Sequence, residues 1–294
     1  MRHHGPRSAA VTCLGASSIA ALTLLVACDR EAAHAPPPEP VDFANHERQV
    51  FSQFGEDGVI EEIFRRIEPT SRYAVEFGAS DGVGGSNVRN LYLNHGWSGL
   101  LIEGDPGLAE KMRQNYADLP RVQAMEAWVF PGNIETLFED AGVPDDLDFL
   151  VIDIDSNDYW VWKVMHRFRA KVVMIEINPF FPPPRLMVID FHPMNFWDKT
   201  HYAGASLESM IRLGREKGYE PVYLSAGLNL FFAKREYYER FGIEDNSAEA
   251  LHKEPPALMR LFDHRPQGEG DVPFEKPYLE YGELRIEKKF HFDR

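Results

Sequence analysis

The chain has 294 residues and a formal net charge of −15. Its hydrophobic content of 44% and its aromatic content of 12% are typical of a globular protein with a substantial core. A chain this acidic lacks the basic surface that sequence-independent nucleic-acid binding needs, so we expect no nucleic-acid partner. The acidity favours solubility over a specific acidic interaction surface.

The N-terminal segment differs in composition from the rest of the chain. Arg2 and Arg7 precede an uncharged run that spans residues 8–28. A basic start followed by an apolar stretch is typical of a signal peptide, which we place at residues 1–28. The run ends in the sequence LVAC, which resembles a bacterial lipobox. That resemblance implies cleavage before Cys28 and lipidation of its thiol.

The fate of this segment decides the expected compartment. A cleaved and lipidated chain would be a membrane-anchored lipoprotein of the bacterial envelope. About 20 uncharged residues can also span a bilayer, and such an uncleaved anchor could leave the domain facing the cytoplasm. A misassigned start codon is a third alternative. Residues 29–45 are rich in proline and predict an extended tether.

Residues 46–242 are predicted to form one α/β domain. Short apolar segments alternate with segments at helical spacing, and strands that are apolar throughout indicate a parallel sheet buried on both faces. The expected strands are 73–77, 99–103, 122–125, 149–153 and 171–176. The expected helices are 57–67, 87–95, 107–117, 133–141, 159–168 and 205–217.

The regular alternation ends after the fifth strand. Residues 178–204 are rich in Pro, Phe and His, and a long stretch without periodicity is typical of a functional loop or lid. Segments 220–224 and 229–233 are too close together for a crossover, so they predict an antiparallel hairpin. The fold class is therefore α/β, with a mostly parallel seven-stranded sheet and a C-terminal hairpin. Residues 243–294 predict a peripheral extension.

Polar residues at the ends of the first three strands predict a nucleoside site, because ligands of parallel sheets bind at the carboxyl ends of the strands. Gly78 lies in the turn after the first strand, where glycine lets the backbone approach a ligand closely. Asp81 in the same turn could meet a cation or a hydroxyl group. Glu103 follows Gly78 by 25 residues, close to the spacing of a ribose-binding carboxylate. Trp128, after the third strand, could line an adenine pocket or pack in the core.

Acidic residues follow the fourth and fifth strands. Asp153 and Asp155 would share a side of an extended strand. Glu176 and Asn178 end the next strand, and neighbouring strands lie about 5 Å apart. Carboxylate and amide groups suit Mg²⁺ or Ca²⁺, although helix caps and ribose or amine contacts are the alternative. His192, in the loop that follows, is a candidate acid–base group.

Six segments between residues 50 and 234 carry a family resemblance. They are Ser52–Gly58, Val75–Gly82, Leu101–Asp105, Val151–Trp160, Gly204–Leu207 and Gly227–Phe232. In these segments the chain resembles class I S-adenosylmethionine-dependent methyltransferases and, more narrowly, FkbM-type methyltransferases. The resemblance implies a Rossmann-like methyltransferase fold and S-adenosylmethionine as the cofactor.

The resemblance also implies roles for individual residues. Glu76 and Gly78 would flank the methionine part of the cofactor, and Glu103 would bind both ribose hydroxyls. Asp153 would lie near the methyl donor. Catechol-type methyltransferases hold a metal ion between acids at these strand ends, which would correspond to Asp153, Glu176 and Asn178. In that group an Asp–Asn pair is adjacent, whereas here one residue intervenes.

We therefore expect a methyltransferase that acts on an oxygen atom of a small-molecule or glycan acceptor. Positioning would supply most of the catalysis, and a carboxylate or a histidine would take the proton. The catalytic candidates are Asp153, Asp155 and His192. One alternative is a membrane-anchored, non-catalytic binding protein with a degenerate methyltransferase fold. Another is a metal-dependent enzyme that uses the acids of strands four and five. S-adenosylmethionine is cytosolic, so export through a lipobox would compete with methyl transfer.

Overall fold

The computed structural model describes residues 39–193, 197, 202–254 and 278–280. All of them belong to one unit that spans residues 37–294. Cys28 and the predicted signal peptide lie outside the described residues. Within the described part of the chain, no helix has the length and apolar character needed to cross a membrane.

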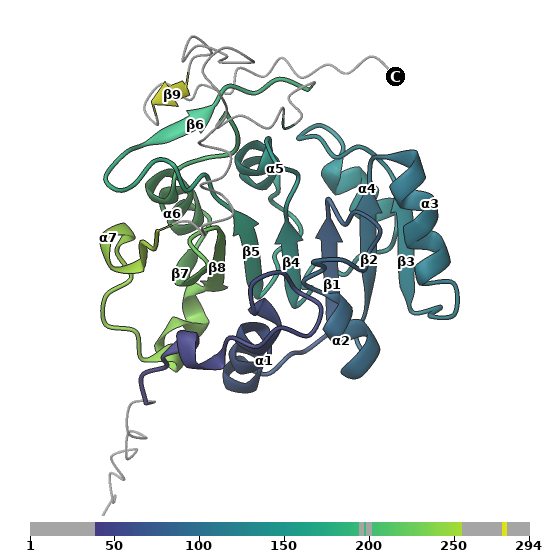
Figure 1. The fold of residues 1–294 in the computed structure, drawn as a ribbon, viewed down its shortest axis with the longest axis horizontal. Coiled ribbons are helices and arrows are strands. Elements are labelled where there is room, and N and C mark those ends of the chain that lie inside the picture. The colour runs from purple at the N-terminus through teal and green to yellow at the C-terminus, as the bar shows by residue number, and fades with distance from the viewer. Residues whose placement is uncertain (1–38, 194–196, 198–201, 255–277, 281–294) are drawn as a thin grey trace, which may run out of the picture. The chain divides into compact units, whose positions relative to one another are not determined.

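A seven-stranded sheet forms the middle layer of this unit (Figure 1). In spatial order its strands are β3 (Val122–Glu126), β2 (Ser98–Glu103), β1 (Tyr73–Phe77), β4 (Phe149–Ile152), β5 (Val172–Glu176), β8 (Asn229–Lys234) and β7 (Tyr219–Ser225). The first five run parallel, and β8 is antiparallel to both of its neighbours. This arrangement confirms the predicted Rossmann-like methyltransferase fold class, including the C-terminal hairpin.

Six helices connect and cover the strands. They are α1 (Glu56–Ile67), α2 (Arg89–Asn94), α3 (Pro106–Asn115), α4 (Ile134–Asp140), α5 (Asp158–Val164) and α6 (Leu207–Glu216). Helix α5 is shorter than predicted because the backbone turns to an extended conformation at Met165. Met165 and Phe168 are buried beyond the helix end, so their apolar character reflects core packing and not helical periodicity.

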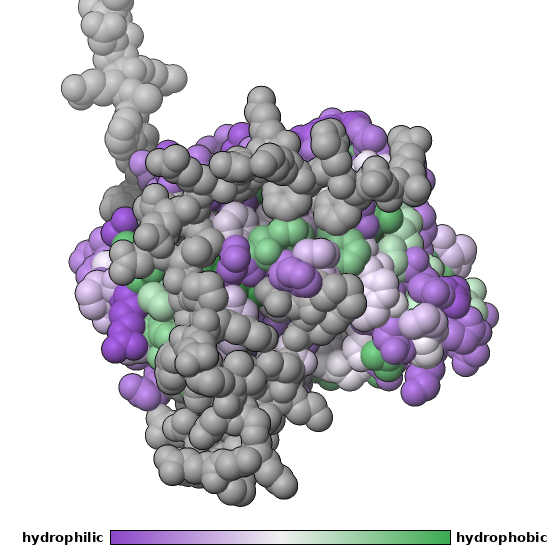
Figure 2. All heavy atoms as spheres, turned by 90° about the horizontal axis from the view of Figure 1, so that it is seen from above, coloured by the Kyte–Doolittle hydropathy of each residue, from purple (hydrophilic) through white to green (hydrophobic). Residues whose placement is uncertain are grey.

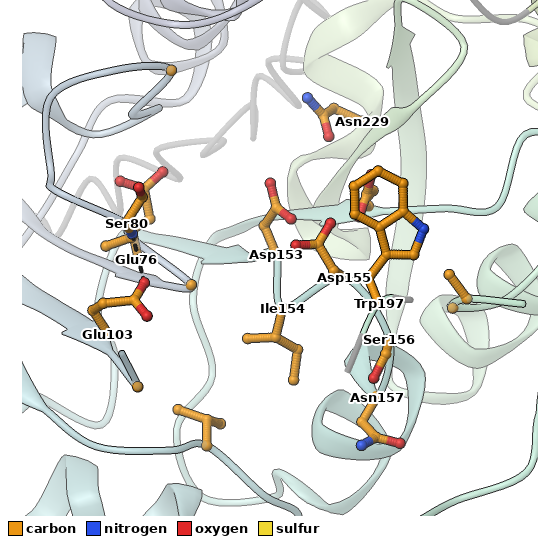
Figure 3. A pocket seen from close by; sticks show the side chains of 18 of the residues that line it. Glu76, Ser80, Glu103, Asp153, Ile154, Asp155, Ser156, Asn157, Trp197 and Asn229 are labelled. Carbon is orange, nitrogen blue, oxygen red and sulfur yellow. Dashed lines mark hydrogen bonds between the residues drawn. The ribbon is translucent and has the colours of Figure 1, made fainter. Parts of the chain in front are cut away.

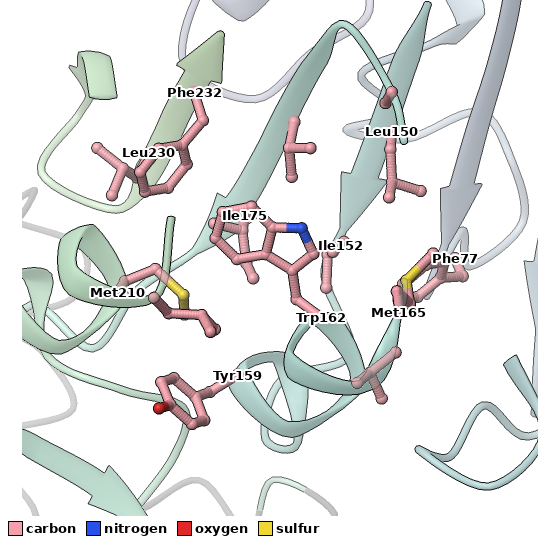
Figure 4. Packing of buried hydrophobic residues seen from close by; sticks show 14 of the residues in the cluster. Phe77, Leu150, Ile152, Tyr159, Trp162, Met165, Ile175, Met210, Leu230 and Phe232 are labelled. Carbon is pink, nitrogen blue, oxygen red and sulfur yellow. The ribbon is translucent and has the colours of Figure 1, made fainter. Parts of the chain in front are cut away.

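Two hydrophobic clusters cover the two faces of the sheet, because side chains alternate along each strand. Helices α1, α2 and α3 contribute to one cluster, and α4, α5 and α6 contribute to the other. In the second cluster, Trp162 of α5 lies over the sheet beside Ile175 and Phe232 (Figure 4). The Trp162 and Phe232 ring centroids are 5.0 Å apart. The sheet is therefore held between helices, and its carboxyl edge is left to build a site.

Two buried acids at the start of α1 tie the N-terminal segment to the sheet. One carboxylate oxygen of Asp57 accepts hydrogen bonds from the backbone N–H groups of residues 50–52, each at 2.8 Å. The Glu56 carboxylate accepts from the Ser225 hydroxyl at 3.2 Å and from the Asn229 amide at 2.9 Å. These bonds fix the segment before α1 against the β7–β8 hairpin.

Packed structure begins within the segment that was predicted to be an extended tether. A short 3-10 helix, η1, spans Phe43–His46, within and just beyond the tether predicted at residues 29–45. Phe43 is buried against the rings of Tyr223 and Phe241. A single aromatic residue among prolines has no periodicity, so sequence patterns do not reveal its contact with residues about 200 positions away.

The predicted loop at residues 178–204 contains a strand. Strand β6 (Met187–Ile189) pairs antiparallel with β9 (Tyr278–Glu280), and Val188 and Ile189 are fully buried. The partner strand lies in the predicted C-terminal extension, which also contains helix α7 (Ala248–Leu251) after a second 3-10 helix, η2 (Arg235–Phe241). Three apolar residues stabilised by a partner about 90 positions away give no local sequence signal.

We predict that Gly214→Ala destabilises the protein. Gly214 lies in α6, and a Cβ atom there would come within 2.3 Å of the Phe232 ring. Overpacking of this kind costs about 1–3 kcal/mol, which exceeds or matches the roughly 1 kcal/mol that alanine gains over glycine in a helix. Urea denaturation should show a lower free energy of unfolding.

Gly107→Ala is the matched control for this substitution. Gly107 is exposed near the start of α3, and its Cβ atom would meet only the Asp105 side chain, at 3.2 Å. The control should be as stable as the natural chain or slightly more stable. An equal loss of stability in both variants would contradict the packing argument.

Candidate active site

A pocket of about 660 Å³ opens at the carboxyl ends of the parallel strands (Figure 3). Five of its lining residues are acidic: Glu76, Glu103, Asp153, Asp155 and Glu176. Among the lining residues that the structure describes, none is Lys, Arg or His. In the described part of this face of the molecule, hydrophobic and hydrophilic residues lie next to one another (Figure 2). The pocket therefore favours a ligand that is positively charged and partly apolar.

Close approach of two strand ends explains the glycine at the end of β1. Gly78 has a φ of +78°, and a Cβ atom there would lie 1.6 Å from the carbonyl oxygen of Asp153. From the sequence we explained this glycine by close approach of the backbone to a ligand. The structure shows that the end of β4 already requires a glycine here. The same approach places Asp153 beside the turn after β1, at the pocket.

Glu103, at the end of β2, is held in place by two backbone N–H groups. Its carboxylate oxygens accept hydrogen bonds from Ser80 and Asp105, both at 2.7 Å. Ser80 adopts a φ of +53°, a conformation that is costly for a non-glycine residue and that points its N–H group at Glu103. Each carboxylate oxygen keeps a second lone pair that could accept a ribose hydroxyl.

Trp128 lies on the pocket wall next to the end of β2. It is 47% exposed, which excludes the alternative of a core tryptophan. Its ring covers Gly104, where a Cβ atom would come within 2.3 Å of the indole. The glycine after Glu103 therefore leaves room for a flat aromatic surface close to the predicted ribose site.

Three acids converge at the ends of β4 and β5. Carboxylate oxygens of Asp153, Asp155 and Glu176 all lie within 4.8 Å of one another. Asp155 reaches this position because its φ is +60°, so the chain turns there and does not continue as the extended strand that the sequence analysis assumed. The predicted proximity of these groups is confirmed, but its geometric reason was wrong.

Two of these acids interact directly with each other. The carboxyl groups of Asp153 and Glu176 hydrogen-bond to each other, which requires one of them to be protonated. Burial, and then the negative charge of Asp155, raises the pKa of Asp153 well above its usual range. Burial, and then the charge of Asp153, raises the pKa of Glu176 in the same direction. Both carboxyl groups are therefore protonated more readily than ordinary Asp and Glu side chains.

Two other acids, one in the pocket lining and one beside it, are buried within the protein. Glu76 accepts hydrogen bonds from the Ser86 hydroxyl at 2.6 Å and the Asn87 backbone N–H at 2.9 Å, yet burial raises its pKa to about 7. Asp158, the first residue of α5, accepts from the Ile154 backbone N–H at 2.8 Å, and burial raises its pKa to about 6. Asp158 thus fixes the turn that carries Asp155.

Two predicted site residues do not line the pocket. The Asp81 carboxylate accepts hydrogen bonds from the backbone N–H groups of Val83 and Gly84, at 2.9 and 3.2 Å, and these bonds lower its pKa. Asp81 therefore closes the turn after β1. The backbone carbonyl of His192 accepts a hydrogen bond from the Asn157 amide at 3.1 Å. Its neighbour Pro193 lines the pocket, whereas His192 does not.

Asn178 lines the pocket, but its amide is engaged within the protein. The amide nitrogen donates to the carbonyl of Ala203 at 2.9 Å, and the amide oxygen accepts from the Phe180 backbone N–H at 3.0 Å. Asn178 therefore organises the loop after β5. The predicted metal site consisted of Asp153, Glu176 and Asn178. In the structure, the cluster contains Asp155 and not Asn178.

Asn229 is a pocket residue to which the sequence analysis gave no role. It is 4% exposed and is the first residue of β8, directly opposite Glu176 in the antiparallel pair. The available signal was a polar residue between the apolar residues of a predicted strand, at the same edge of the sheet as the acids. Gln53 and Phe54, from the segment before α1, also line the pocket.

No family model and no curated protein matches the chain. Matching solved structures include the mitomycin 7-O-methyltransferase MmcR, with 14% identity over 60% of this chain and 55% of that chain and a TM-score of 0.36. The CurJ carbon methyltransferase matches with 12% identity over 60% and 52%, at a TM-score of 0.40. A SAM dependent methyltransferase from Aquifex aeolicus matches with 10% identity over 66% and 98%, at 0.39.

The chain spans about half the length of the first two of these structures. The matched structures are class I methyltransferases that act on oxygen, carbon or nitrogen. At identities of 10–14% and TM-scores of 0.36–0.40, these matches assign the chain to no family and identify no acceptor.

We predict that Glu76→Gln changes how stability depends on pH. An acid whose pKa is raised by folding stabilises the folded state below its ordinary pKa of 4.5, and this contribution is lost as the pH rises toward about 7. Glutamine stays neutral and shows no such loss. The free energy of unfolding of the variant, minus that of the natural chain, should therefore rise between about pH 5 and pH 8.

Denaturant unfolding at several pH values measures this difference. Taking the difference between the two proteins cancels the contributions of groups that do not interact with Glu76, whereas the negative charge of Glu76 also raises the pKa of Asp153. A difference that stays constant over this range would contradict the raised pKa of Glu76.

Proposed function

We propose that the chain is an S-adenosylmethionine-dependent methyltransferase. The observation that carries the proposal is an open pocket in which Glu103 and the β4–β5 acids face the same space without a described basic residue. Nucleotide cofactors such as NAD and ATP carry phosphates, which five acidic side chains repel. S-adenosylmethionine combines a nucleoside with a net positive charge, so its chemistry matches this lining.

The pocket residues fit the parts of this cofactor. Glu103 has free lone pairs for both ribose hydroxyls, and Trp128 offers a flat surface for adenine next to it. Gly78 and Glu76 border the space for the methionine part, and Asp153 lies between this space and β5. An open pocket beside Gly78 and Glu103 supports this proposal over a non-catalytic protein whose cofactor site is filled by side chains.

We propose an oxygen atom of a small molecule or glycan as the methyl acceptor. The cofactor supplies a sulfonium methyl group, which moves to the oxygen as its bond to sulfur breaks. Asp155 is the most exposed of the three clustered acids and is therefore placed to accept the hydroxyl proton. Burial and neighbouring negative charge raise the pKa of both Asp153 and Glu176, so we assign them to orienting the acceptor and not to the role of base.

We propose membrane attachment through residues 1–28 as a separate property. Cleavage and lipidation at Cys28 would place the protein in the bacterial envelope, whereas an uncleaved segment would retain Met1. The cofactor is cytosolic, so methyl transfer requires the domain to meet it on the cytoplasmic side of the membrane.

Cell fractionation with mass analysis of the N-terminus tests this attachment. We expect the chain in the membrane fraction, because the uncharged run is apolar and follows a basic start. The mass distinguishes an acylated Cys28 from a retained Met1. Recovery of the full-length chain in the soluble fraction would contradict membrane attachment.

We predict that the purified chain binds S-adenosylhomocysteine and that Glu103→Ala weakens this binding about tenfold or more, as expected for losing hydrogen bonds to a charged group. Isothermal titration calorimetry measures the affinity. NAD and ATP should not bind.

Two further variants control for unfolding and for charge. Glu103→Ala also frees two backbone N–H groups, so thermal unfolding must show that the variant is folded. Trp128→Ala removes the proposed adenine surface without touching Glu103 and should also weaken binding. Asp118→Asn, at an exposed position outside the pocket lining, should change nothing. Unchanged affinity in both pocket variants would refute the proposal.

A further inference from the structure

We infer that Asp153, Asp155 and Glu176, with the amide oxygen of Asn229, form a binding site for a divalent metal ion of the Mg²⁺, Mn²⁺ or Ca²⁺ type. This inference goes beyond the proposed function, since the site needs neither S-adenosylmethionine nor an acceptor. Three carboxylates alone do not define such a site. The additional observation is Asn229, which lines the same pocket from strand β8 of the β7–β8 hairpin.

The amide oxygen of Asn229 is buried without a hydrogen-bond partner in the described part of the chain. The residue is 4% exposed and lines the pocket. An unsatisfied buried polar group costs about 1–3 kcal/mol, and such groups in folded proteins call for an explanation such as an ion. Its side chain points into the pocket beyond Asp153 and Asp155 (Figure 3).

The orientation of this amide follows from its chemistry. The amide nitrogen of Asn229 donates to the Glu56 carboxylate at 2.9 Å, and a carboxylate oxygen accepts such a bond. The nitrogen therefore faces Glu56, and the oxygen must face the other way, toward the pocket. Glu56 is itself anchored by the Ser225 hydroxyl and by the Phe54 backbone N–H at 2.7 Å. A buried network thus holds the oxygen in place.

Sheet register brings this oxygen to the acids. Asn229 and Glu176 are direct partners across the antiparallel β5–β8 pair. Side chains of directly opposed residues lie on the same face of a sheet, with Cβ atoms about 4.5–5.5 Å apart. Glu176 in turn hydrogen-bonds to Asp153 and lies with Asp155 in the three-acid cluster.

The four groups offer oxygen atoms, three of them from carboxylates that lie within 4.8 Å of one another. A hard divalent cation prefers oxygen ligands of this kind, from carboxylates and amides together. A metal ion would pair with the clustered carboxylates and would also satisfy the amide oxygen of Asn229. A metal ion therefore accounts for both observations.

Binding of Mn²⁺ alone to the purified full-length chain tests the inference. Electron paramagnetic resonance follows the loss of the free Mn²⁺ signal, and calorimetry with Mg²⁺ and Ca²⁺ extends the measurement. We expect one saturable site. Asp155→Asn should weaken Mn²⁺ binding about tenfold or more, since loss of even an outer-sphere partner costs this much. Asp118→Asn removes the same charge from an exposed position and should leave binding unchanged.

A second pair of variants isolates the amide oxygen. Asn229→Ala and Ser225→Ala each remove one hydrogen-bond donor from Glu56, but Ser225 does not line the pocket. Asn229→Ala should weaken Mn²⁺ binding, and Ser225→Ala should not. Thermal unfolding without metal shows whether all four variants are folded.

Three results would overturn the inference. They are the absence of saturable Mn²⁺ binding into the millimolar range, equal Mn²⁺ affinity in Asp155→Asn and the natural chain, and saturable binding of methylammonium without binding of Mn²⁺. The last result would assign the site to an organic ammonium group. S-adenosylhomocysteine binding, measured without metal, is independent of these outcomes and separates failure of this site from failure of the proposed function.

Discussion

The ends of β1 and β4 approach so closely that residue 78 has no space for a side chain. The carbonyl oxygen of Asp153 occupies the position that a Cβ atom of Gly78 would take. Glycine at this position allows the chain after β4 to lie beside the turn after β1, so that Asp153 lines the same pocket as Glu76 and Glu103. One steric constraint therefore joins the part of the pocket around Glu103 to the part around the β4–β5 acids.

The part of the pocket around the β4–β5 acids follows from three local features of the chain. The left-handed conformation at Asp155 returns its carboxylate toward β5, and Asp158 holds that turn through the Ile154 N–H group. Glu176 then closes the cluster from the neighbouring strand. Each feature is weak alone, but together they place three carboxyl groups within 4.8 Å, so the pocket must hold protons or bind a cation.

Sequence patterns predicted the sheet well because its strands are apolar throughout and are separated by single helices. The spacing of Glu103 from Gly78 placed both residues at one pocket for the same reason, since both end neighbouring parallel strands. Patterns failed where the determining partner is distant or the backbone is unusual. The β6–β9 pair joins segments about 90 residues apart, the turn at Asp155 requires a positive φ, and the orientation of Asn229 depends on Glu56 across the fold.

Protonation of the clustered acids and binding of a cation would each relieve the same electrostatic repulsion. The chain carries a net charge of −15. Acidic side chains on the surface would be screened by water and salt at little cost in free energy. Five acidic side chains instead line one pocket, where their mutual repulsion destabilises the unliganded protein. Local destabilisation of this kind is typical of functional sites. Binding of a positive ligand recovers that free energy. The negative charge of the pocket therefore favours positively charged ligands, and hydrogen bonds then discriminate among ligands of that charge.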